Sequence, residues 1–520
     1  QFSTSTQDAV GTTPTIIPPI PGHDVTVISN QISNISSRGF DISVDVDDGD
    51  GDATVALYFC NETDTPSCDP LLGTSFDLTR VGNTFEISVT DLASPNDFND
   101  IINYEVVVND PDGVTVTPIQ GQITLYEVFE IYRSVGPNNA SVVDDNSTGT
   151  MTILNNAVTF SASVADNIGL GDVIVYDSDA KIAFITERID STAFKAKKAD
   201  GASDPDPITA NGDWKIYRAY TSFINAENGD ENSGIPVGVR DFDAWIGGYD
   251  LVTNDQQWNL VMYADGVDDI GGSSVVIDGW TTDDSHRLKI FTPYLSTQVG
   301  KSQRHQGKMS YAFYKLKSTN ADNLNIKIPY VEINGLQFEM IENDASPYLN
   351  NVHIDLSLGA VAGSEVVISN NIMNINKQAA NYNCYNILAQ NDASNSNIKN
   401  YIINNITYFS NLNSSNGHGI RAHEGMHYIS NNTVHGASMG INCYAEGTCI
   451  AKNNIAQKFS GTYDAASDYN LSFTTNLPGG TNDVGDSSVM FRNEANFDLR
   501  LSPRDKNARA KGGDLSADVN

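Results

Sequence analysis

The sequence predicts an all-β fold, in which an N-terminal β-sandwich is followed by a solenoid of stacked strands with a short helical cap. Two observations predict this fold. Short alternating strands separated by turns fill the region from about residue 25 to residue 127, and one asparagine-bearing phrase recurs five times between residues 331 and 459. A repeat period between 20 and 50 residues is typical of stacked structural units.

The repeated phrase places a polar turn after a short strand. Its five first asparagines are Asn334, Asn370, Asn404, Asn431 and Asn453. Asparagine enters the left-handed backbone region at low cost, and its amide can bond to equivalent residues in adjacent repeats. We therefore expect these asparagines to turn the chain between two faces of a coil.

A second pattern lies between the copies of the phrase. Three segments align so that Ile387, Ile420 and Cys443 share one column, and a column of alanines follows two residues later. Successive side chains of a strand point to opposite faces, so these columns are predicted to face inward. The two outward columns then contain Leu388, Arg421 and Tyr444, and Gln390, His423 and Glu446.

Varying repeat length combined with a constant strand pattern resembles the right-handed parallel β-helix proteins of the pectate-lyase-like superfamily, over roughly residues 250 to 510. Leucine-rich repeats also use an asparagine ladder, but their Leu-x-Leu frame is missing here. The segment Phe497-Asp-Leu-Arg-Leu-Ser-Pro503 resembles the closing segment of many bacterial β-helix proteins. We therefore expect the solenoid to end within the chain.

The predicted organisation has four parts: an N-terminal arm or linker (1–24), a β-sandwich (25–127), a small β module or the beginning of the solenoid (128–210), and a capped parallel β-helix (211–520). The sandwich resembles an immunoglobulin-like or fibronectin type III module around Tyr104-Glu-Val-Val-Val-Asn-Asp. Helices are expected around residues 214–225 and 239–251, in a region rich in aromatic residues. In the second of them, Phe242 and Trp245 lie three residues apart, on one helical face. Such a helix would cover the open first rung.

Composition indicates a secreted protein. Thirty basic residues against 65 acidic ones give a formal charge of −35, which repels nucleic acid and anionic lipid. No apolar run approaches the roughly 18–20 residues that span a bilayer. The chain begins at Gln1, which we interpret as the result of signal-peptide removal. We therefore expect an extracellular or cell-surface location, no nucleic-acid partner and no membrane insertion.

Cysteines and glycosylation sequons fit this location. Cys60 and Cys68 bracket a short loop that a disulfide would close in an oxidising compartment. Cys443 is predicted to be a core residue, and Cys449 is predicted to face outward. The chain also contains eight sequons, of which those at Asn405 and Asn431 belong to the repeat phrase. The remaining six are candidate glycosylation sites: Asn34, Asn61, Asn139, Asn146, Asn413 and Asn470.

An acidic run in the sandwich is a candidate metal site. Asp45, Asp47, Asp50 and Asp52 are interleaved with glycines that would help the chain to bend. Calcium prefers several hard oxygen ligands on such a loop. The run is not an EF-hand, because the glycine is misplaced and the terminal glutamate is missing. It therefore either binds calcium or forms a solvated acidic turn, and no other cofactor is expected.

Histidines and charged residues between His418 and His435 are the candidate site on the solenoid. Stacking gathers no carboxylate pair beside a base there, and no short catalytic motif occurs in the chain. We therefore expect no catalytic activity. Arg421, His423 and Glu446 are catalytic candidates only in the alternative function, a polysaccharide lyase or glycoside hydrolase.

The function expected from the sequence is that of a structural, adhesive surface glycoprotein. The N-terminal arm would add as a strand to a sheet edge of the next copy and so join subunits into a filament. The expected partners are therefore further copies of this chain and carbohydrate. A phage or virus fibre is a further alternative, which would form a stable trimer.

Overall fold

The computed structural model divides the chain into two compact units, Gln1–Val128 and Phe129–Asn520. This boundary lies next to the sequence-predicted end of the sandwich at residue 127. The structure describes residues 26–36, 39–47, 53–61, 70–72, 74–81, 84–89, 101–109, 118–124, 128–145, 149–243, 245, 248–344, 348–356, 363–378, 383–391, 398–412, 416–444, 447–513 and 515. The predicted arm (1–24) lies outside these residues.

The smaller unit consists of two antiparallel sheets of four strands each. One has the order β1 (Thr26–Ser36), β2 (Gly39–Asp47), β6 (Thr84–Val89) and β5 (Thr79–Val81). The other has the order β4 (Thr74–Asp77), β3 (Thr54–Asn61), β7 (Ile101–Asn109) and β8 (Ile119–Thr124). Alternate residues of both sheets, including Val44, Leu57 and Val106, form one buried apolar cluster. The two sheets therefore share a core.

The larger unit contains three long parallel sheets with eight, eight and seven strands. The first contains β9 (Phe129–Val135), β18 (Gln256–Met262), β21 (Leu288–Phe291), β24 (Val331–Asn334), β27 (Glu365–Ser369), β30 (Lys399–Ile403), β33 (Met426–Ser430) and β36 (Thr448–Lys452). The second contains β19 (Val267–Gly271), β22 (Lys315–Thr319), β25 (Gln337–Glu342), β28 (Ile372–Lys377), β31 (Ile406–Leu412), β34 (Thr433–His435), β37 (Ile455–Ala456) and β39 (Leu471–Ser472). The third contains β20 (Val275–Ile277), β23 (Leu324–Ile326), β26 (Leu349–Leu356), β29 (Cys384–Asn391), β32 (Gly417–His423), β35 (Met439–Tyr444) and β38 (Phe459–Gly461).

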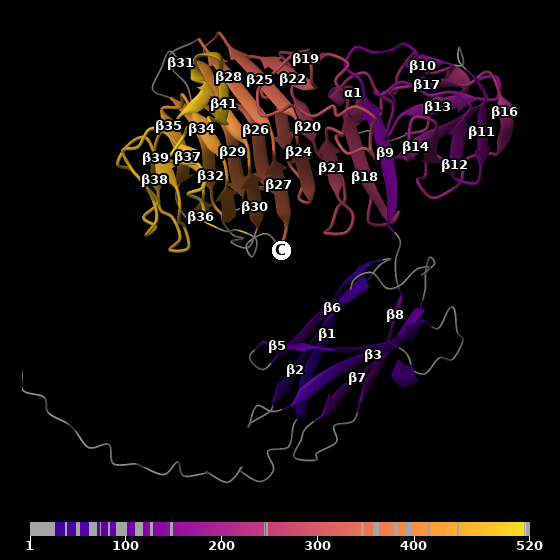
Figure 1. The fold of residues 1–520 in the computed structure, drawn as a ribbon, viewed down its shortest axis with the longest axis horizontal. Coiled ribbons are helices and arrows are strands. Elements are labelled where there is room, and N and C mark those ends of the chain that lie inside the picture. Colours follow the sequence, from indigo (N-terminus) through magenta and orange to yellow (C-terminus); the bar gives the residue numbers. More distant parts are fainter. Residues whose placement is uncertain are drawn as a thin grey trace, which may run out of the picture. The chain divides into compact units, whose positions relative to one another are not determined.

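Successive strands visit the three sheets in turn, so each circuit of the chain adds one rung to a column (Figure 1). The inward positions stack in register: Ile333, Ile368, Ile402 and Ile429 pair along the first sheet and are fully buried. No rung encloses this core alone, so stacking provides it. The predicted all-β class is confirmed, and the parallel sheets are compatible with a β-helix-like fold.

The asparagine phrases form one corner of the column. Asn370, Asn404, Asn431 and Asn453 have positive φ angles between 55° and 58°, as predicted for the turn. The first copy is shifted by one residue, because Asn334 pairs with Ser369 and Gly335 takes the left-handed position with φ 84°. Glycine adopts this conformation without a Cβ penalty. Gly335 therefore takes the left-handed turn position in this copy, and Asn334 stays at the end of the strand.

The second asparagine of each phrase has a different role. Asn371, Asn405, Asn432 and Asn454 are buried, and each Nδ2 donates to the Oδ1 of the asparagine one rung on, at 2.9 to 3.1 Å. The ladder continues to Asn470, which donates to Asp483 at 3.1 Å. Tyr469-Asn470 is thus a further copy, in which Tyr469 occupies the left-handed position with φ 58°.

Residues 128–210, which the sequence left between two interpretations, are divided in the structure. Strand β9 begins the first parallel sheet. The following strands form a separate antiparallel sheet of eight: β10 (Asp144–Asp145), β17 (Lys215–Tyr217), β13 (Val173–Tyr176), β14 (Lys181–Arg188), β15 (Ala193–Lys197), β12 (Ala157–Phe160), β11 (Met151–Leu154) and β16 (Ile208–Asn211). This sheet has its own buried cluster, which includes Phe160, Phe194 and Trp214.

The predicted helices are largely wrong. The described residues contain one α-helix, α1 (Phe223–Asn228), which Ser222 caps and Gly229 ends, and short 3-10 turns at η1 (Pro70–Leu72), η3 (Val237–Val239) and η4 (Glu494–Asn496). Trp214 instead packs in the antiparallel sheet, and Trp245 packs against Trp258 and Trp280. Aromatic residues three apart therefore reflected core packing rather than a helical face. No helix among the described residues has the length and hydropathy to cross a membrane.

The C-terminal segment covers the outer face of the second parallel sheet. The hairpin β40 (Phe491–Asn493) and β41 (Asp498–Leu501) packs Phe491 and Leu499 onto Ile372, Tyr408 and Ile455 of that sheet. The segment that resembles a β-helix ending therefore folds back over the column.

Candidate functional site

The candidate site lies on the outer face of the third parallel sheet. Its strands pair so that His353, Leu388, Arg421 and Asn442 form one outward column. The inward neighbours Ile354, Ala389 and Ala422 are fully buried, as the alternation predicts.

The second outward column contains Gln390, His423 and Tyr444. The predicted alignment of strands β29 and β32 is confirmed, but that of β35 is wrong by two residues. Cys443 pairs with Ala422, and Tyr444 pairs with His423. A shift of two residues preserves the pleat, so the alternation of apolar and polar residues does not reveal it. Tyr444 thus takes the place in this column that the sequence predicted for Glu446. Glu446 itself lies outside the described residues.

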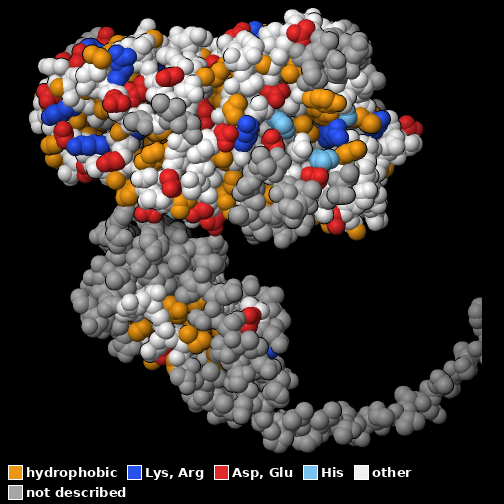
Figure 2. Space-filling model, turned by 180° about the vertical axis from the view of Figure 1, so that it is seen from behind, with side chains coloured by type: hydrophobic (Ala, Val, Ile, Leu, Met, Phe, Trp, Pro, Cys, Tyr) orange, Lys and Arg blue, Asp and Glu red, His pale blue; other side chains and the backbone are white. Residues whose placement is uncertain are grey.

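These outward side chains surround a hollow of about 420 Å³. It crosses four rungs of the sheet and is lined by Asp322, Tyr348, Asn350, His353, Tyr385, Leu388, Gln390, Arg421 and His423. Histidine, cationic and apolar side chains lie close together on one face of the larger unit in Figure 2. Clefts of this size with a few polar groups and aromatic walls are typical of small-ligand sites.

Arg421 is the main cationic group of the hollow. Its Nη1 donates to the Tyr385 hydroxyl at 2.9 Å, and its guanidinium lies 4.4 Å from the centroid of the Tyr444 ring. Among the described residues no carboxylate forms an ion pair with Arg421, whereas the buried Arg133 and Arg218 both bind aspartates. In a chain of formal charge −35, Arg421 is therefore available to an anionic group.

Histidines in and beside the hollow add further polar groups. Burial lowers the pKa of His418, which stacks on Tyr385, to about 4. Burial also lowers the pKa of His353. His423 stacks on Tyr444 with ring centroids 5.2 Å apart, and its Nδ1 lies 3.7 Å from Glu424 Oε2. Arg421 contributes a permanent positive charge, because an arginine guanidinium stays protonated at all ordinary pH values.

Asp322 marks the opposite end of the hollow. Its Oδ1 accepts a hydrogen bond from the Asn350 backbone at 2.6 Å, and burial raises its pKa. Three strand spacings separate the Asp322 rung from the Arg421 rung, which amounts to roughly 14 Å between the backbones. The carboxyl of Asp322 and the guanidinium of Arg421 therefore belong to rungs at opposite ends of the hollow.

The histidine cluster seen in the sequence is dispersed over three sheets. His418 and His423 belong to β32, His427 to β33 and His435 to β34. His427 is fully buried, and burial lowers its pKa to about 4. His435 packs against Phe491 of the C-terminal hairpin. Of the four histidines in this candidate cluster, His418 and His423 therefore share a sheet, and the other two lie on different sheets.

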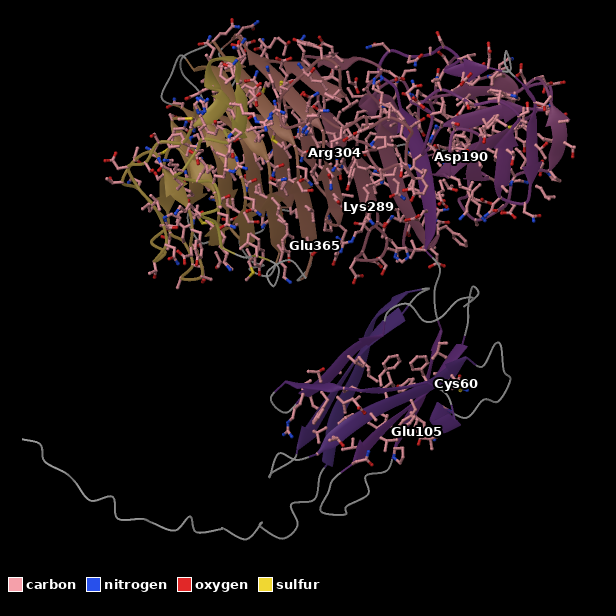
Figure 3. All side chains as sticks on the ribbon, viewed as in Figure 1. Cys60, Glu105, Asp190, Lys289, Arg304 and Glu365 are labelled. Carbon is pink, nitrogen blue, oxygen red and sulfur yellow. A yellow bond between two sulfur atoms is a disulfide. The ribbon has the colours of Figure 1, made fainter. Side chains whose placement is uncertain are left out.

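A disulfide that the sequence did not indicate lies beside the site. Cys443 and Cys449 are bonded, with Cα atoms 6.1 Å apart, and they close the loop that follows Tyr444. Cys443 is buried as predicted, but Cys449 is also buried, so its predicted outward position is wrong. Cys60 lies in the smaller unit near Glu105 (Figure 3), while Cys68 lies outside the described residues. The pairing of Cys60 with Cys68 stays a prediction.

The predicted calcium site is only partly described. Asp45 accepts a hydrogen bond from Thr84 Oγ1 at 2.6 Å, and Asp47 ends strand β2. Asp50 and Asp52 lie outside the described residues. Within the described part of the chain, no three His, Cys, Asp or Glu side chains are grouped to hold a metal ion. Calcium binding by the acidic run stays a prediction.

The sequons differ in the environment of their asparagines. Asn139 Nδ2 donates to Asp265 at 2.8 Å. Asn470 is 1% exposed, and its Nδ2 donates inside the ladder, which is not a position that suits a glycan. Asn146 and Asn413 lie outside the described residues, as do the side chains of Asn34 and Asn61.

Comparison of the chain with protein-family models finds no match, and comparison with curated proteins finds none either.

Proposed function

We propose that this chain is a secreted adhesive protein whose parallel column presents a binding groove for an acidic saccharide. The observation that carries the proposal is Arg421, a guanidinium without a carboxylate partner among the described residues, in a hollow flanked by tyrosines. Arginine binds carboxylates through two parallel hydrogen bonds. The exposed ring of Tyr348 provides an amphipathic surface suited to a sugar ring.

We further infer that the column is a right-handed β-helix of the pectate-lyase-like kind and that the smaller unit is an immunoglobulin-like sandwich. Three stacked parallel sheets support the first inference. Two antiparallel sheets that share a core support the second. The buried disulfide between Cys443 and Cys449 supports an extracellular location, because disulfides persist in oxidising compartments.

Binding without catalysis agrees with the groove. Glycoside hydrolysis needs two carboxyl groups within roughly 10 Å of each other, on either side of the scissile bond. Among the described residues that line the hollow, Asp322 is the one carboxylic acid. The alternative, a lyase or hydrolase acting through Arg421, His423 and Glu446, requires Glu446 to complete the groove.

The test is to measure binding of uronate-containing oligosaccharides to the full chain by calorimetry. Arg421→Ala should weaken binding by about 10- to 100-fold, because one charge-assisted contact is lost. Arg421→Lys should retain part of the affinity. The matched control is Arg304→Ala. The guanidinium carbon of Arg304 also lies over a tyrosine, 3.9 Å from the centroid of the Tyr294 ring, but Arg304 does not line the hollow.

Unchanged affinity in Arg421→Ala would overturn the proposed groove. The same incubations should produce no new reducing ends and no unsaturated sugars. Product formation that is lost in both Arg421→Ala and His423→Ala would establish the enzyme alternative instead.

We also propose that copies of this protein assemble through the N-terminal arm, by strand addition to a neighbouring sheet edge. The arm lies outside the described residues, so the proposal stays with the sequence, where a polar segment precedes Pro14 and the prolines at 18, 19 and 21. Negative-stain images of the full chain should show polymers, and deletion of residues 1–22 should abolish them. Polymers that survive the deletion would exclude the arm, and a stable trimer would favour a fibre.

A further inference from the structure

The outer asparagines of the corner form a hydrogen-bonded series that is interrupted at one position. Asn370 Nδ2 donates to Asn334 Oδ1 at 3.3 Å, and Asn404 Nδ2 donates to Asn370 Oδ1 at 2.7 Å. Asn431 has the same left-handed backbone, with φ 58°. Its side chain is exposed, however, and its amide has no hydrogen-bond partner among the described residues.

The next outer asparagine, Asn453, does have a hydrogen-bond partner. Asn453 Nδ2 donates to the Gly513 carbonyl at 3.0 Å, and its Oδ1 accepts from the Gly513 N–H at 2.8 Å. The inner ladder is also continuous past this point, because Asn432 is bonded to Asn454. The backbone at Asn431 therefore has the same geometry as at the outer asparagines of the rungs on either side. Only the hydrogen bond of its side-chain amide is missing within the part of the chain that the structure describes.

Asn431 begins the sequon Asn431-Asn432-Thr433. A sequon asparagine carries its glycan on the amide nitrogen, which gives up one of its two N–H groups. An amide nitrogen that makes no internal hydrogen bond therefore loses no contact when it is modified. Among the sequon asparagines whose side chains the structure describes, Asn139, Asn405 and Asn470 all donate through Nδ2 to protein acceptors. Asn431 is the one that does not.

A hollow of about 370 Å³ lies next to this amide, between the asparagine corner and the C-terminal segment. Its polar lining includes Asn431, Asn482, Arg500, Asn507 and Lys511. Amide and cationic groups of this kind can donate hydrogen bonds to the hydroxyl and acetamido oxygens of a sugar. The corner thus combines an amide nitrogen to which a glycan can be attached, Asn431 Nδ2, with a polar space for the first sugar.

We propose that Asn431 is an N-glycosylation site and that its first sugar sits in this hollow. The donor class is a saccharide linked to a lipid through a diphosphate. Asn431 Nδ2 forms a bond to the anomeric carbon and loses a proton, while the bond from that carbon to the diphosphate oxygen breaks. The lipid diphosphate leaves with the electron pair. The proposal rests on the extracellular location proposed above.

The inner asparagines provide the contrast. Asn405 and Asn470 are almost fully buried and donate to backbone carbonyls at 2.8 and 2.7 Å. Each of these nitrogens donates to at least two acceptors, so a glycan would leave one N–H for them and would also need space between the rungs. A folded, secreted chain should therefore have no glycan at Asn405 or Asn470.

The test is secretion of the full chain from a eukaryotic cell line, followed by enzymatic glycan release in heavy-oxygen water and peptide mapping. The label should appear at Asn431 and be absent from Asn405 and Asn470. Asn431→Gln and Thr433→Val should each remove it, whereas Asn404→Gln should retain it. A bare Asn431 in the folded, secreted chain would overturn the proposal, whether or not another sequon is occupied.

A second measurement tests the seating of the sugar. Release from the native protein should be slower than from the denatured protein, and Asn507→Ala should reduce that difference. Equal rates for native and denatured protein would exclude the seated sugar. Saccharide binding by the groove is measured separately on the Asn431→Gln chain, so failure of the groove and failure of the glycan site are distinguishable.

Discussion

At the scale of single residues, Glu227 is the side chain of α1 whose ionisation is opposed most strongly by burial. This side chain is 7% exposed, and its Oε1 accepts a hydrogen bond from Trp280 Nε1 at 2.9 Å. Its Oε2 is buried without a hydrogen-bond partner among the described residues. Burial raises the pKa of Glu227 to about 8. The carboxyl is therefore protonated at neutral pH, and ionisation would place a charge beside three packed tryptophans.

This burial predicts a pH dependence of stability. The folded pKa of Glu227 exceeds its unfolded value, so its contribution is fully present below the unfolded pKa of 4.5 and is lost as the pH rises toward 8. Glu227→Gln keeps the acceptor for Trp280 and cannot ionise. It should therefore gain stability relative to the wild type between pH 5 and 9 (roughly), by on the order of 3–5 kcal/mol at the alkaline end.

The measurement is urea unfolding of both proteins over that pH range, followed by tryptophan fluorescence. Glu494→Gln is the matched control, because the Glu494 side chain is 58% exposed. The control should follow the wild-type profile. Parallel profiles for Glu227→Gln and the wild type would contradict a protonated Glu227.

At the scale of elements, the asparagine turn was predictable because one residue type solves one backbone problem. The left-handed φ at Asn370, Asn404, Asn431 and Asn453 follows from the phrase itself. The separate role of the second asparagine does not, because burial depends on the neighbouring rungs. Tyr469 also escaped prediction, since tyrosine has no local preference for the left-handed position that it occupies.

The groove was harder to predict than the turn, and the rung spacing explains why. The histidines between residues 418 and 435 are close in sequence, but one circuit of the column is longer than one strand, so they fall on different sheets. Residues that meet on one face instead recur at the rung spacing, as His353, Leu388 and Arg421 do. That spacing is the signal in the sequence that could have placed His353 in the same column as Arg421, two rungs away.

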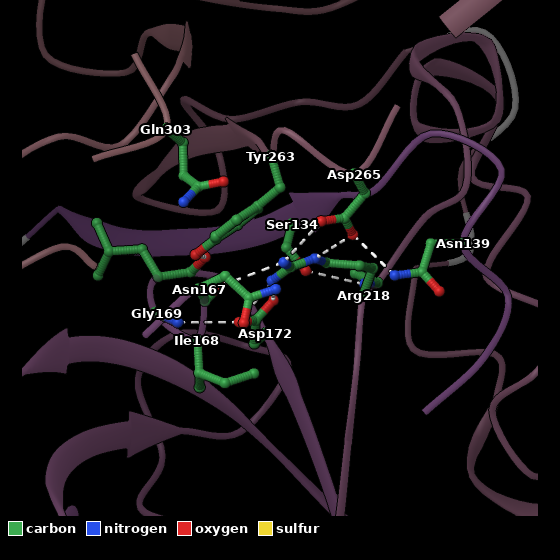
Figure 4. A network of polar contacts seen from close by, with 12 residues as sticks. Ser134, Asn139, Asn167, Ile168, Gly169, Asp172, Arg218, Tyr263, Asp265 and Gln303 are labelled. Atoms are coloured by element: carbon green, nitrogen blue, oxygen red, sulfur yellow. Dashed lines mark hydrogen bonds and ion pairs between the residues drawn. The ribbon is translucent and has the colours of Figure 1, made fainter. Parts of the chain in front are cut away.

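At the scale of the whole molecule, a buried ionic network joins the antiparallel sheet to the parallel column within the larger unit. Arg218 is fully buried between Asp172, at 2.7 Å, and Asp265, at 2.8 Å (Figure 4). Asp172 precedes strand β13 of the antiparallel sheet, while Asp265 follows strand β18 of the column. The guanidinium also lies 3.6 Å from the centroid of the Tyr263 ring.

Removal of this guanidinium should destabilise the larger unit strongly. Arg218→Met leaves two buried carboxylates without their cation, which costs about 3–5 kcal/mol. The control Arg500→Met breaks a pair with Asp498 in which the Arg500 side chain is 33% exposed, and should cost below about 1 kcal/mol. The measurement is the urea midpoint of each variant, together with hydrogen exchange in strands β13 and β17.

Because the three charges act together, adding Asp172→Asn and Asp265→Asn to Arg218→Met should restore part of the lost stability. Equal costs for the two arginine variants would show that the network does not hold the antiparallel sheet against the column.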